Sequence, residues 1–521
     1  MLDTLITNAK IVDGTGSAWF FGAVGVEDGR IQIIHGDISG IVSGQIIDAQ
    51  NNIVCPGFID MHAHSGLVAL SNPRHEPKVR QGVTTELIGV DGNSYAPFAA
   101  AADFDDFVLL NAGLDGRPPK GQRWASVSEY LSLFDRKTSC NFAYVIGNSA
   151  LRIGSVGWED RKATSDELQT MKQLIRQGMY EGAFGISTGL TYPPGSYADT
   201  PELIEISREV ADLGGIYVTH VRYPLGDRFM DPFKEAIQIG RRSGVPVHIS
   251  HLHNANAGGA KKLLPLVDDA RAEGIDVTFD SYAYPYTSTR LVSILPEWAH
   301  RGGPHALMDL MRSTDGRKQI AESLASRPRS WNSILVANFG GPANKKWEGR
   351  SVDSISKELG KSFPDTICDL LLEENLDLAY TSLGGNPVNI REFFRHEAHM
   401  VGSDALLIGD FVNPRTYGNY PTILGDFVRE ESTLGLEEAI RKMTGFPAQR
   451  LGLEDRGLLK DGMVADIVVF NPTTVQTTAT IDDPRHHPIG IDYVFVNGTA
   501  VINDGNHTGA MPGLALRHQC K

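Results

Sequence analysis

The chain has 521 residues, which is long enough for a large catalytic domain and an accessory domain. Hydrophobic residues make up 41% of it and charged residues 21%, as in ordinary globular proteins. The formal net charge of −15, with no basic cluster, argues against a nucleic-acid partner. No apolar run approaches the roughly 20 residues that a membrane span requires.

The cysteines and the N-terminus indicate the compartment. Cys55, Cys140, Cys368 and Cys520 have no CxxC spacing, which predicts free thiols in a reducing environment. Residues 1–6 lack the basic region, apolar core and cleavage site of a signal peptide. We therefore expect a cytoplasmic protein that acts on a small molecule, with no nucleic-acid or membrane partner. The sequence leaves its oligomeric state open.

The two ends of the chain share a strand-like texture. Residues 1–54 contain short alternating runs broken by Gly, Asp and Asn, and similar runs return at 465–470 and 493–498. The sequence therefore predicts one small β-sandwich domain assembled from residues 1–54 and 456–521.

Between the two ends, strand-like runs alternate with helical patterns. Examples are the helical run 202–211 before the strand 215–220, and the run 262–273 before 275–280. This rhythm predicts an α/β fold in which residues 55–455 form a (β/α)8 barrel. A doubly wound sheet is the alternative, but no GxGxxG follows the first strand. Residues from about 285 to 345, rich in Pro, Trp and Arg, interrupt the rhythm and indicate an inserted, lid-like segment.

The most informative stretch is residues 55–64, an apolar run that ends in a His-x-His pair. Alternate side chains of a strand point the same way, so His62 and His64 are expected to project together from the C-terminal end of a barrel strand. Two neutral imidazoles that converge on one point suit a divalent transition metal. Two unrelated surface or core histidines are the alternative interpretation.

Further strand-like runs also end in metal-binding or acidic residues. These residues are Asp91, His220, His251 and Asp404. In a parallel barrel, residues at the strand ends meet at one mouth, so the coincidence favours a metal centre.

These residues lie within motifs that carry a resemblance. The motifs are Pro-Gly-Phe-Ile-Asp-x-His-x-His at 56–64, Gln-Gly-Val-Thr-Thr at 81–85, Phe-Gly-Ile-Ser-Thr-Gly-Leu at 184–190, Thr-His-Val-Arg at 219–222, Ile-Ser-His at 249–251, Gly-Ser-Asp at 402–404 and Asn-Pro-Arg-Thr-Tyr-Gly at 413–418. In this order they resemble the N-acyl-D-amino-acid deacylases (D-aminoacylases) of the metal-dependent amidohydrolase superfamily. The match runs nearly from end to end.

The resemblance implies a set of site residues. One tightly bound zinc would be held by Asp91, His220 and His251, and a weaker second site by His62, His64 and Asp404. Asp404 matches the family's general base. Tyr192 and Arg415 match positions that contact the substrate, the arginine at the substrate's carboxylate.

Three departures from the family pattern concern this site. Asp91 stands where the family usually has a cysteine, and a carboxylate is a harder ligand than a thiolate. His253 replaces a lysine that is expected to help hold the substrate's carboxylate. Ser65 and Gly66 stand where acidic residues commonly follow the His-x-His pair. The family's catalytic residues are mostly kept, whereas the substrate pocket is changed.

The expected activity is zinc-dependent hydrolysis of the amide bond of an N-acylated amino acid, of the D series, by a metal-activated water. The alternatives are an amidohydrolase acting on a cyclic amide, a carbamate or an ester, and a barrel that binds a ligand without turnover. Ser187, in Gly-Ile-Ser-Thr-Gly, also fits a serine-hydrolase motif, although the many histidines typical of metal sites disfavour a serine hydrolase.

The altered pocket also leads to an expectation about the substrate. With His253 in place of the lysine, we expect weaker selection for acidic amino acids and tolerance for bulkier, aromatic or esterified substrates. The inserted segment, with Trp298 and Trp331, is expected to close over such a group.

Overall fold

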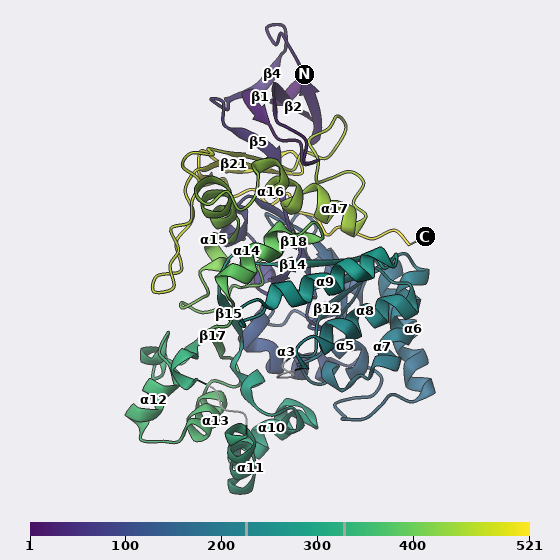
Figure 1. Cartoon of the computed structure of the whole chain (residues 1–521), viewed down its shortest axis with the longest axis vertical. Coiled ribbons are helices and arrows are strands. Elements are labelled where there is room, and N and C mark those ends of the chain that lie inside the picture. Colours follow the sequence, from purple (N-terminus) through teal and green to yellow (C-terminus); the bar gives the residue numbers. More distant parts are fainter. Residues whose placement is uncertain (224–227, 327–329, 521) are drawn as a thin grey trace.

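The structure is a computed structural model that describes residues 1–223, 228–326 and 330–520. Figure 1 shows three parts stacked along the longest axis: a sheet formed by the chain ends, a central region of strands and helices, and a cluster of inserted helices at the opposite end.

The central region is a closed ring of parallel strands, as the sequence predicts. Each strand pairs in parallel with the next, and β19 pairs with β7 to close the ring. The strands, in ring order, are β6 (Phe58–Asp60) with β7 (Ala63–His64), β8 (Val83–Ile88), β9 (Asn141–Tyr144) with β10 (Ile146–Gly147), β11 (Gly185–Gly189), β12 (Ile216–His220), β13 (Val247–Ile249), β14 (Val277–Ser281), and β18 (His399–Val401) with β19 (Ala405–Leu406). This topology is a (β/α)8 barrel.

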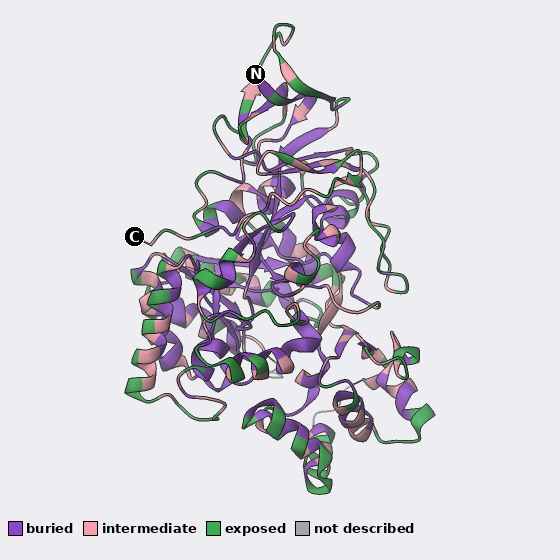
Figure 2. Cartoon of the chain, turned by 180° about the vertical axis from the view of Figure 1, so that it is seen from behind, coloured by how far each residue is buried: buried purple, intermediate pink, exposed green. Residues whose placement is uncertain are grey.

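Helices follow the barrel strands, and local sequence signals set several of their starts. Thr164 and Glu167 form a capping box at the start of α6, and the carboxylate of Asp199 caps α7. The helices are α1 (Val68–Ser71), α2 (Glu76–Val79), α3 (Ala101–Asp115), α4 (Val127–Ser132), α5 (Asn148–Ile153), α6 (Ser165–Tyr180), α7 (Thr200–Asp212), α8 (Asp231–Ser243), α9 (Gly259–Ala272), α14 (Pro387–Arg395), α15 (Arg415–Thr422), α16 (Leu436–Met443) and α17 (Gly445–Leu451). Figure 2 shows buried residues running through the barrel and along the inner faces of these helices.

Both chain ends contribute to one sheet, which packs against the barrel through side chains such as Val468 and Val494. Its strands are β1 (Leu2–Ile11), β2 (Phe20–Glu27), β3 (Arg30–Ile34), β4 (Ser43–Asp48), β5 (Ile53–Pro56), β20 (Ile467–Phe470), β21 (Ile491–Val496), β22 (Thr499–Asn503) and β23 (Asn506–His507). The antiparallel pair of β20 with β5 joins the two ends. All nine strands belong to one hydrogen-bonded sheet, and side chains from both chain ends, such as Ile6, Val24, Ile467 and Phe495, pack together in one small core. The small β-rich domain built from both chain ends is therefore as predicted.

The inserted segment lies between barrel strands β14 and β18 and extends beyond its predicted end near residue 345. It contains β15 (Tyr286–Arg290), α10 (Gly303–Arg312), α11 (Thr314–Ala325), β16 (Leu335–Ala337), α12 (Val352–Leu359), α13 (Phe363–Glu373) and β17 (Ala379–Leu383). The prediction stopped early because α12 and α13 have the same amphipathic pattern as barrel helices. The expected role of Trp298 and Trp331 is also corrected, since both pack against the insertion's own core.

The structure also describes the cysteines and the apolar character of the helices. All four cysteines are free. No helix in the described part of the chain has both the length and the apolar character that a membrane crossing would need.

The C-terminal tail closes the end of the barrel away from the strands' C-terminal ends. The Leu516 amide donates to the Phe142 carbonyl at 2.7 Å, and the Leu516 side chain packs in the barrel interior with residues such as Met61 and Val218. The last residues of the chain therefore complete the core on which the site is built.

We predict that Leu516→Ala lowers the free energy of unfolding by about 2–4 kcal/mol, because it leaves a cavity in that interior. Urea unfolding followed by circular dichroism measures the change. Val388→Ala, at a position 64% exposed on α14, is the matched control and is expected to change it by less than about 0.5 kcal/mol. Equal midpoints for the two variants would contradict this role of the tail.

Candidate metal centre

The structure brings together all six residues that the sequence marks as metal-binding. They lie at the C-terminal ends of the barrel strands: His62 and His64 at β6 and β7, Asp91 after β8, His220 at the end of β12, His251 after β13, and Asp404 between β18 and β19. All six side chains belong to buried residues.

Asp91 is at the centre of the group. Its Oδ1 lies 3.5 Å from His62 Nε2, and its Oδ2 lies 3.6 Å from His64 Nε2. The same Oδ2 lies 3.5 Å from both His220 Nδ1 and His251 Nε2. Asp91 therefore belongs to two possible metal-binding groups, one with His62 and His64 and one with His220 and His251.

The spacing of these atoms suits a small divalent cation. Metal–ligand bonds of about 2.0–2.1 Å in a tetrahedron put neighbouring ligand atoms roughly 3.3–3.4 Å apart. His62 Nε2 and His64 Nε2 are 3.4 Å apart, and His64 Nε2 is 3.3 Å from Asp404 Oδ1. In addition, the buried Oδ1 of Asp91 has no hydrogen-bond partner. The donor set therefore fits zinc or a similar metal.

The backbone is strained at three of the site residues. Asp91, His251 and Asp404 have φ angles of 56°, 33° and 47°, in the left-handed region that residues with side chains rarely adopt. At each position the chain leaves a barrel strand and turns, so the side chain is directed into the mouth of the barrel. Such strain persists only where the surrounding contacts hold it in place.

Polar partners fix the orientation of the imidazole rings. His64 Nδ1 lies 3.0 Å from Asp115 Oδ1, at the end of α3, and His220 Nε2 lies 2.6 Å from the Thr191 hydroxyl. These contacts leave Nε2 of His64 and Nδ1 of His220 directed toward Asp91. A second contact on the far ring nitrogen is typical of metal-binding histidines, because it fixes the tautomer.

A second buried carboxylate, Asp280, supports two of the histidines from below. Its Oδ1 accepts a hydrogen bond of 2.9 Å from the His251 amide, and its Oδ2 lies 3.8 Å from His62 Nδ1. Burial opposes a positive charge on His62, but Asp91 and Asp280 outweigh it and raise the pKa of His62 to about 10. The site therefore attracts positive charge.

A buried ion-pair network joins the first and last strands of the barrel beneath the site. Lys78 Nζ contacts Asp60, lies 2.8 Å from Glu86 Oε1 and donates to the Ser403 hydroxyl at 2.7 Å. Asp60 Oδ1 in turn accepts from the amides of His62, at 3.1 Å, and Ser403, at 2.8 Å. This network fixes the backbone that carries His62 and Asp404.

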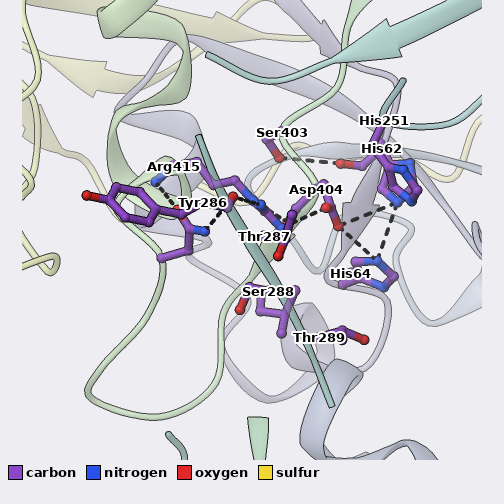
Figure 3. Close-up of polar contacts among 12 residues, drawn as sticks. His62, His64, His251, Tyr286, Thr287, Ser288, Thr289, Ser403, Asp404 and Arg415 are labelled. Carbon is purple, nitrogen blue, oxygen red and sulfur yellow. Dashed lines mark hydrogen bonds and ion pairs between the residues drawn. The ribbon is translucent and has the colours of Figure 1, made fainter. Parts of the chain in front are cut away.

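Asp404 lies between the histidines and Arg415 (Figure 3). Arg415 donates through Nη2 to Asp404 Oδ2 at 2.7 Å, through Nε to the Asp404 carbonyl at 2.8 Å, and through Nη1 to the Tyr286 carbonyl at 2.7 Å. Burial opposes ionisation of Asp404, but Arg415 outweighs it and lowers the pKa of the carboxyl to about 2. Asp404 is therefore an anion at neutral pH.

Arg415 differs from the expectation that it meets the substrate's carboxylate. It is fully buried and does not line the cavity, because its donors are directed at Asp404 and Tyr286. Tyr192 and His253, the other two expected substrate-binding residues, do line it. Their roles stay predictions.

The cavity above the metal-binding residues has a volume of about 300 Å³. Besides His64, Asp91, His220, His251 and Asp404, its walls include residues of the inserted segment, namely Thr287, Ser288, Thr289, Ser293 and Tyr380. Figure 3 shows the strand that carries Thr287, Ser288 and Thr289 passing beside Asp404 and His64. The insertion therefore forms one wall of the site.

Ser187, the candidate nucleophile of the alternative motif, has a structural role. Its buried hydroxyl donates to the Gly89 carbonyl and accepts a hydrogen bond of 3.0 Å from the Gly92 amide. It thereby fixes the turn that carries Asp91. No base is hydrogen-bonded to it among the described residues, so the serine-hydrolase interpretation has no support.

Sequence reasoning missed Asp115, Thr191, Asp280 and Lys78. Asp280 ends a strand-like run, as the six predicted residues do, and that signal could have found it. Asp115 and Lys78 lie on helices, where neither a motif nor a strand end marks them. In the sequence, Asp60 stands out only as part of the motif that contains the His-x-His pair, and its role in the buried ion-pair network is not indicated.

Comparisons with known proteins agree with this geometry. Residues 389–502 match the sequence profile of the amidohydrolase family. The D-aminoacylase of Alcaligenes xylosoxydans xylosoxydans is 33% identical over 518 residues, which cover 99% of this chain and 97% of that protein. The N-acyl-D-glutamate deacylase of the same organism is 32% identical over 510 residues, covering 96% of this chain and 94% of that protein.

Comparison with solved structures also finds D-aminoacylases and N-acyl-D-amino-acid deacylases. A D-aminoacylase studied for the functional role of its binuclear metal centre superposes with a TM-score of 0.83 at 31% identity, covering 99% of this chain and 100% of that one. An N-acyl-D-glutamate deacylase from Bordetella bronchiseptica, complexed with zinc and a phosphonate inhibitor, gives a TM-score of 0.82 at 29% identity, with 99% and 100% covered.

A parallel barrel with histidines and carboxylates converging at its mouth defines a metal-dependent hydrolase of the amidohydrolase class. Within that class, the chain belongs to the family of D-aminoacylases and N-acyl-D-amino-acid deacylases, which hydrolyse amide bonds.

We predict that Asp115→Asn weakens metal binding by about 10–100-fold, because the amide no longer fixes the tautomer and orientation of His64. Competition with a chromophoric chelator measures the affinity. Asp105→Asn is the matched control on the same helix, since Asp105 is half exposed and pairs with Arg123. If both variants bound metal as tightly as the wild type, Asp115 would have no role in holding the ligand.

Proposed function

We propose that the protein is a zinc-dependent hydrolase that cleaves the amide bond of an N-acylated D-amino acid. The observation that carries this proposal is the carboxylate of Asp91 shared by two pairs of histidines, with the ionised Asp404 beside it. Relatives named as deacylases of N-acyl-D-aspartate and N-acyl-D-glutamate, and the zinc complex of one such enzyme, support the substrate class and the metal.

Two groups of residues would hold the metal. Asp91, His220 and His251 would hold one tightly bound zinc. His62, His64 and Asp404 would form the second, weaker site, with Asp91 available to both. Bound zinc supplies a Lewis acid that polarises the acyl oxygen and lowers the pKa of a water molecule to about 7. Because Asp91 replaces a thiolate, we expect the site to accept harder metals as well.

Asp404 is the proton carrier in this proposal. Its Oδ2 is fixed by Arg415, whereas its Oδ1 faces His64 and the cavity. As general base it takes a proton from the attacking water, and as general acid it delivers that proton to the nitrogen of the leaving amine. Arg415 is then a positioning residue, because it fixes the carboxylate and contacts no substrate atom.

Tyr192 and His253 are proposed to contact the substrate. The Tyr192 ring lies against the metal-facing residue His220, with ring centroids 4.7 Å apart, and its hydroxyl lies 3.2 Å from the Thr289 hydroxyl. His253 Nδ1 donates to the His251 carbonyl at 2.9 Å, which directs the rest of its ring into the cavity.

The test of this function combines metal analysis with a substrate panel. We expect purified, active protein to contain zinc, to lose activity on chelation and to regain it with added zinc. It should release free amine from N-acetyl-D-amino acids faster than from their L enantiomers. Activity without any transition metal, or turnover of a hydantoin or an ester with none of the linear amides, would contradict the proposal.

A second prediction isolates proton transfer. Asp404→Asn is expected to keep the fold and most of the metal while activity falls roughly 10²–10⁴-fold, because an amide cannot accept the proton. Steady-state kinetics and metal content of the same preparation measure both. Near wild-type turnover by this variant would show that Asp404 does not transfer the proton.

A further inference from the structure

A second, smaller cavity adjoins the metal-facing one, and we call it the side cavity. It has a volume of about 220 Å³ and shares four lining residues with the metal-facing cavity: Thr191, Tyr192, Tyr223 and Ser293. Much of the remaining wall is apolar, with side chains such as Leu190, Pro193, Ile294 and Leu295. Arg290, at the end of the inserted strand β15, also lines it.

Arg290 is buried without an anionic partner. The residue is 2% exposed, and its one hydrogen bond from the guanidinium is Nη1 to the amide oxygen of Asn93 at 3.3 Å. Within residues 1–223, 228–326 and 330–520, no carboxylate oxygen lies within 4.0 Å of that guanidinium. Burial lowers the pKa of Arg290 by more than the nearby groups, such as Tyr192 and Asp115, raise it, as expected for a buried cation without a carboxylate in contact.

The other buried arginines in the described part of the chain show that this is unusual. Each of them contacts a carboxylate at 2.6 or 2.7 Å: Arg152 with Glu202, Arg415 with Asp404, Arg450 with Asp276, and Arg456 with Asp466. Buried charges in proteins are normally paired in this way, and an exception calls for a functional explanation.

A second unpartnered group lines the same cavity. His300 is buried, and its Nδ1 has no hydrogen-bond partner. Burial lowers the pKa of His300 to about 3, so the ring is neutral, with one N–H donor and one acceptor nitrogen. The carboxylate among the lining residues is that of Glu297, which is exposed at the rim and accepts from the Ser196 hydroxyl at 2.5 Å. Among the described residues, the inner part of the side cavity therefore presents the guanidinium of Arg290 and the neutral ring of His300, and no carboxylate.

The side cavity is also coupled to the reaction site. The guanidinium carbon of Arg290 lies 4.5 Å from the centroid of the Tyr192 ring, and that ring in turn lies against His220. A single aromatic side chain thus separates Arg290 from a residue proposed to hold the metal. A substrate that occupies the metal-facing cavity needs to extend only past Tyr192 to reach this cation.

We infer that Arg290 binds a carboxylate of the substrate in the side cavity. This inference rests on the proposed function, because N-acyl amino acids are the substrates that bring a carboxylate to this place. The planar fork of a guanidinium matches a carboxylate with two parallel hydrogen bonds. Arg290 supplies the cation that the metal-facing cavity lacks, since His253 replaces the expected lysine and the donors of Arg415 are directed at Asp404 and Tyr286. The bound group is the amino acid's α-carboxylate or a carboxylate in its side chain.

The test compares substrates that differ only in one carboxylate. N-acetyl-D-leucine and N-acetyl-D-leucinamide report on the α-carboxylate, whereas N-acetyl-D-glutamate and N-acetyl-D-glutamine report on a side-chain carboxylate. We expect Arg290→Met to lower kcat/KM by about 10–100-fold for the member of one pair that carries the carboxylate under test, and to leave the amide member of that pair within twofold. The pair that responds identifies the carboxylate. Arg290→Lys should restore part of the preference, because it keeps the charge but loses the fork.

Stability gives an independent readout. Because Arg290 has no carboxylate partner, Arg290→Met is expected to unfold at the same temperature as the wild type or at a higher one. The control is Arg301→Met, an exposed arginine paired with Asp160 near the same cavity, which should leave both substrate ratios unchanged. Equal losses on the acid and the amide in both pairs, or acid-to-amide ratios that Arg290→Met leaves unchanged in both pairs, would overturn the inference.

Binding separates this inference from the proposed function. If zinc-loaded wild type hydrolysed none of these compounds, the function would fail, and titration calorimetry of the same compounds would then decide about Arg290. Binding of a charged member 10–100-fold weaker to Arg290→Met than to wild type would sustain the carboxylate site. Equal binding, or no binding to the wild type, would refute it.

Discussion

The site depends on one shared anion, the carboxylate of Asp91. Four imidazoles from three different barrel strands lie within 3.6 Å of its oxygens. Burial opposes ionisation of Asp91, but the surrounding histidines outweigh it and lower the pKa of the carboxyl well below its usual value. A buried anion with one unpartnered oxygen is a strong reason for a cation to bind.

The scaffold around Asp91 explains how it is held. Ser187 forms hydrogen bonds with the turn that carries Asp91. The network of Lys78, Asp60 and Ser403 joins the strands that carry His62 and Asp404. Positions on barrel strands are rigid, so they place ligand atoms more accurately than loops do. The inserted segment contributes residues for substrate recognition. It brings Thr287, Ser288 and Thr289 to the wall of the metal-facing cavity and Arg290 to the side cavity, so that substrate recognition can change without disturbing the metal-binding residues.

The sequence predicted the barrel and the convergence of six histidines and aspartates at its mouth, because both follow from short-range patterns. A strand places its last residue at the barrel mouth whatever the rest of the chain does. The roles of Arg415 and Arg290 could not be predicted in this way, because they depend on partners far away in the chain. Arg415 lies in a motif that suggests substrate binding, yet its partners make it a support for Asp404. Arg290 lies in no motif, and only the absence of a carboxylate beside it within the described residues draws attention to it.

The central claim is that Asp91 is a metal ligand shared by the two groups of histidines. X-ray diffraction data collected above and below the zinc absorption edge, from crystals of the zinc-loaded protein, test it most directly. We expect an anomalous peak within bonding distance of Asp91 Oδ2, His220 Nδ1 and His251 Nε2. Zinc held by the histidines with Asp91 turned away, or no zinc at the barrel mouth, would contradict it.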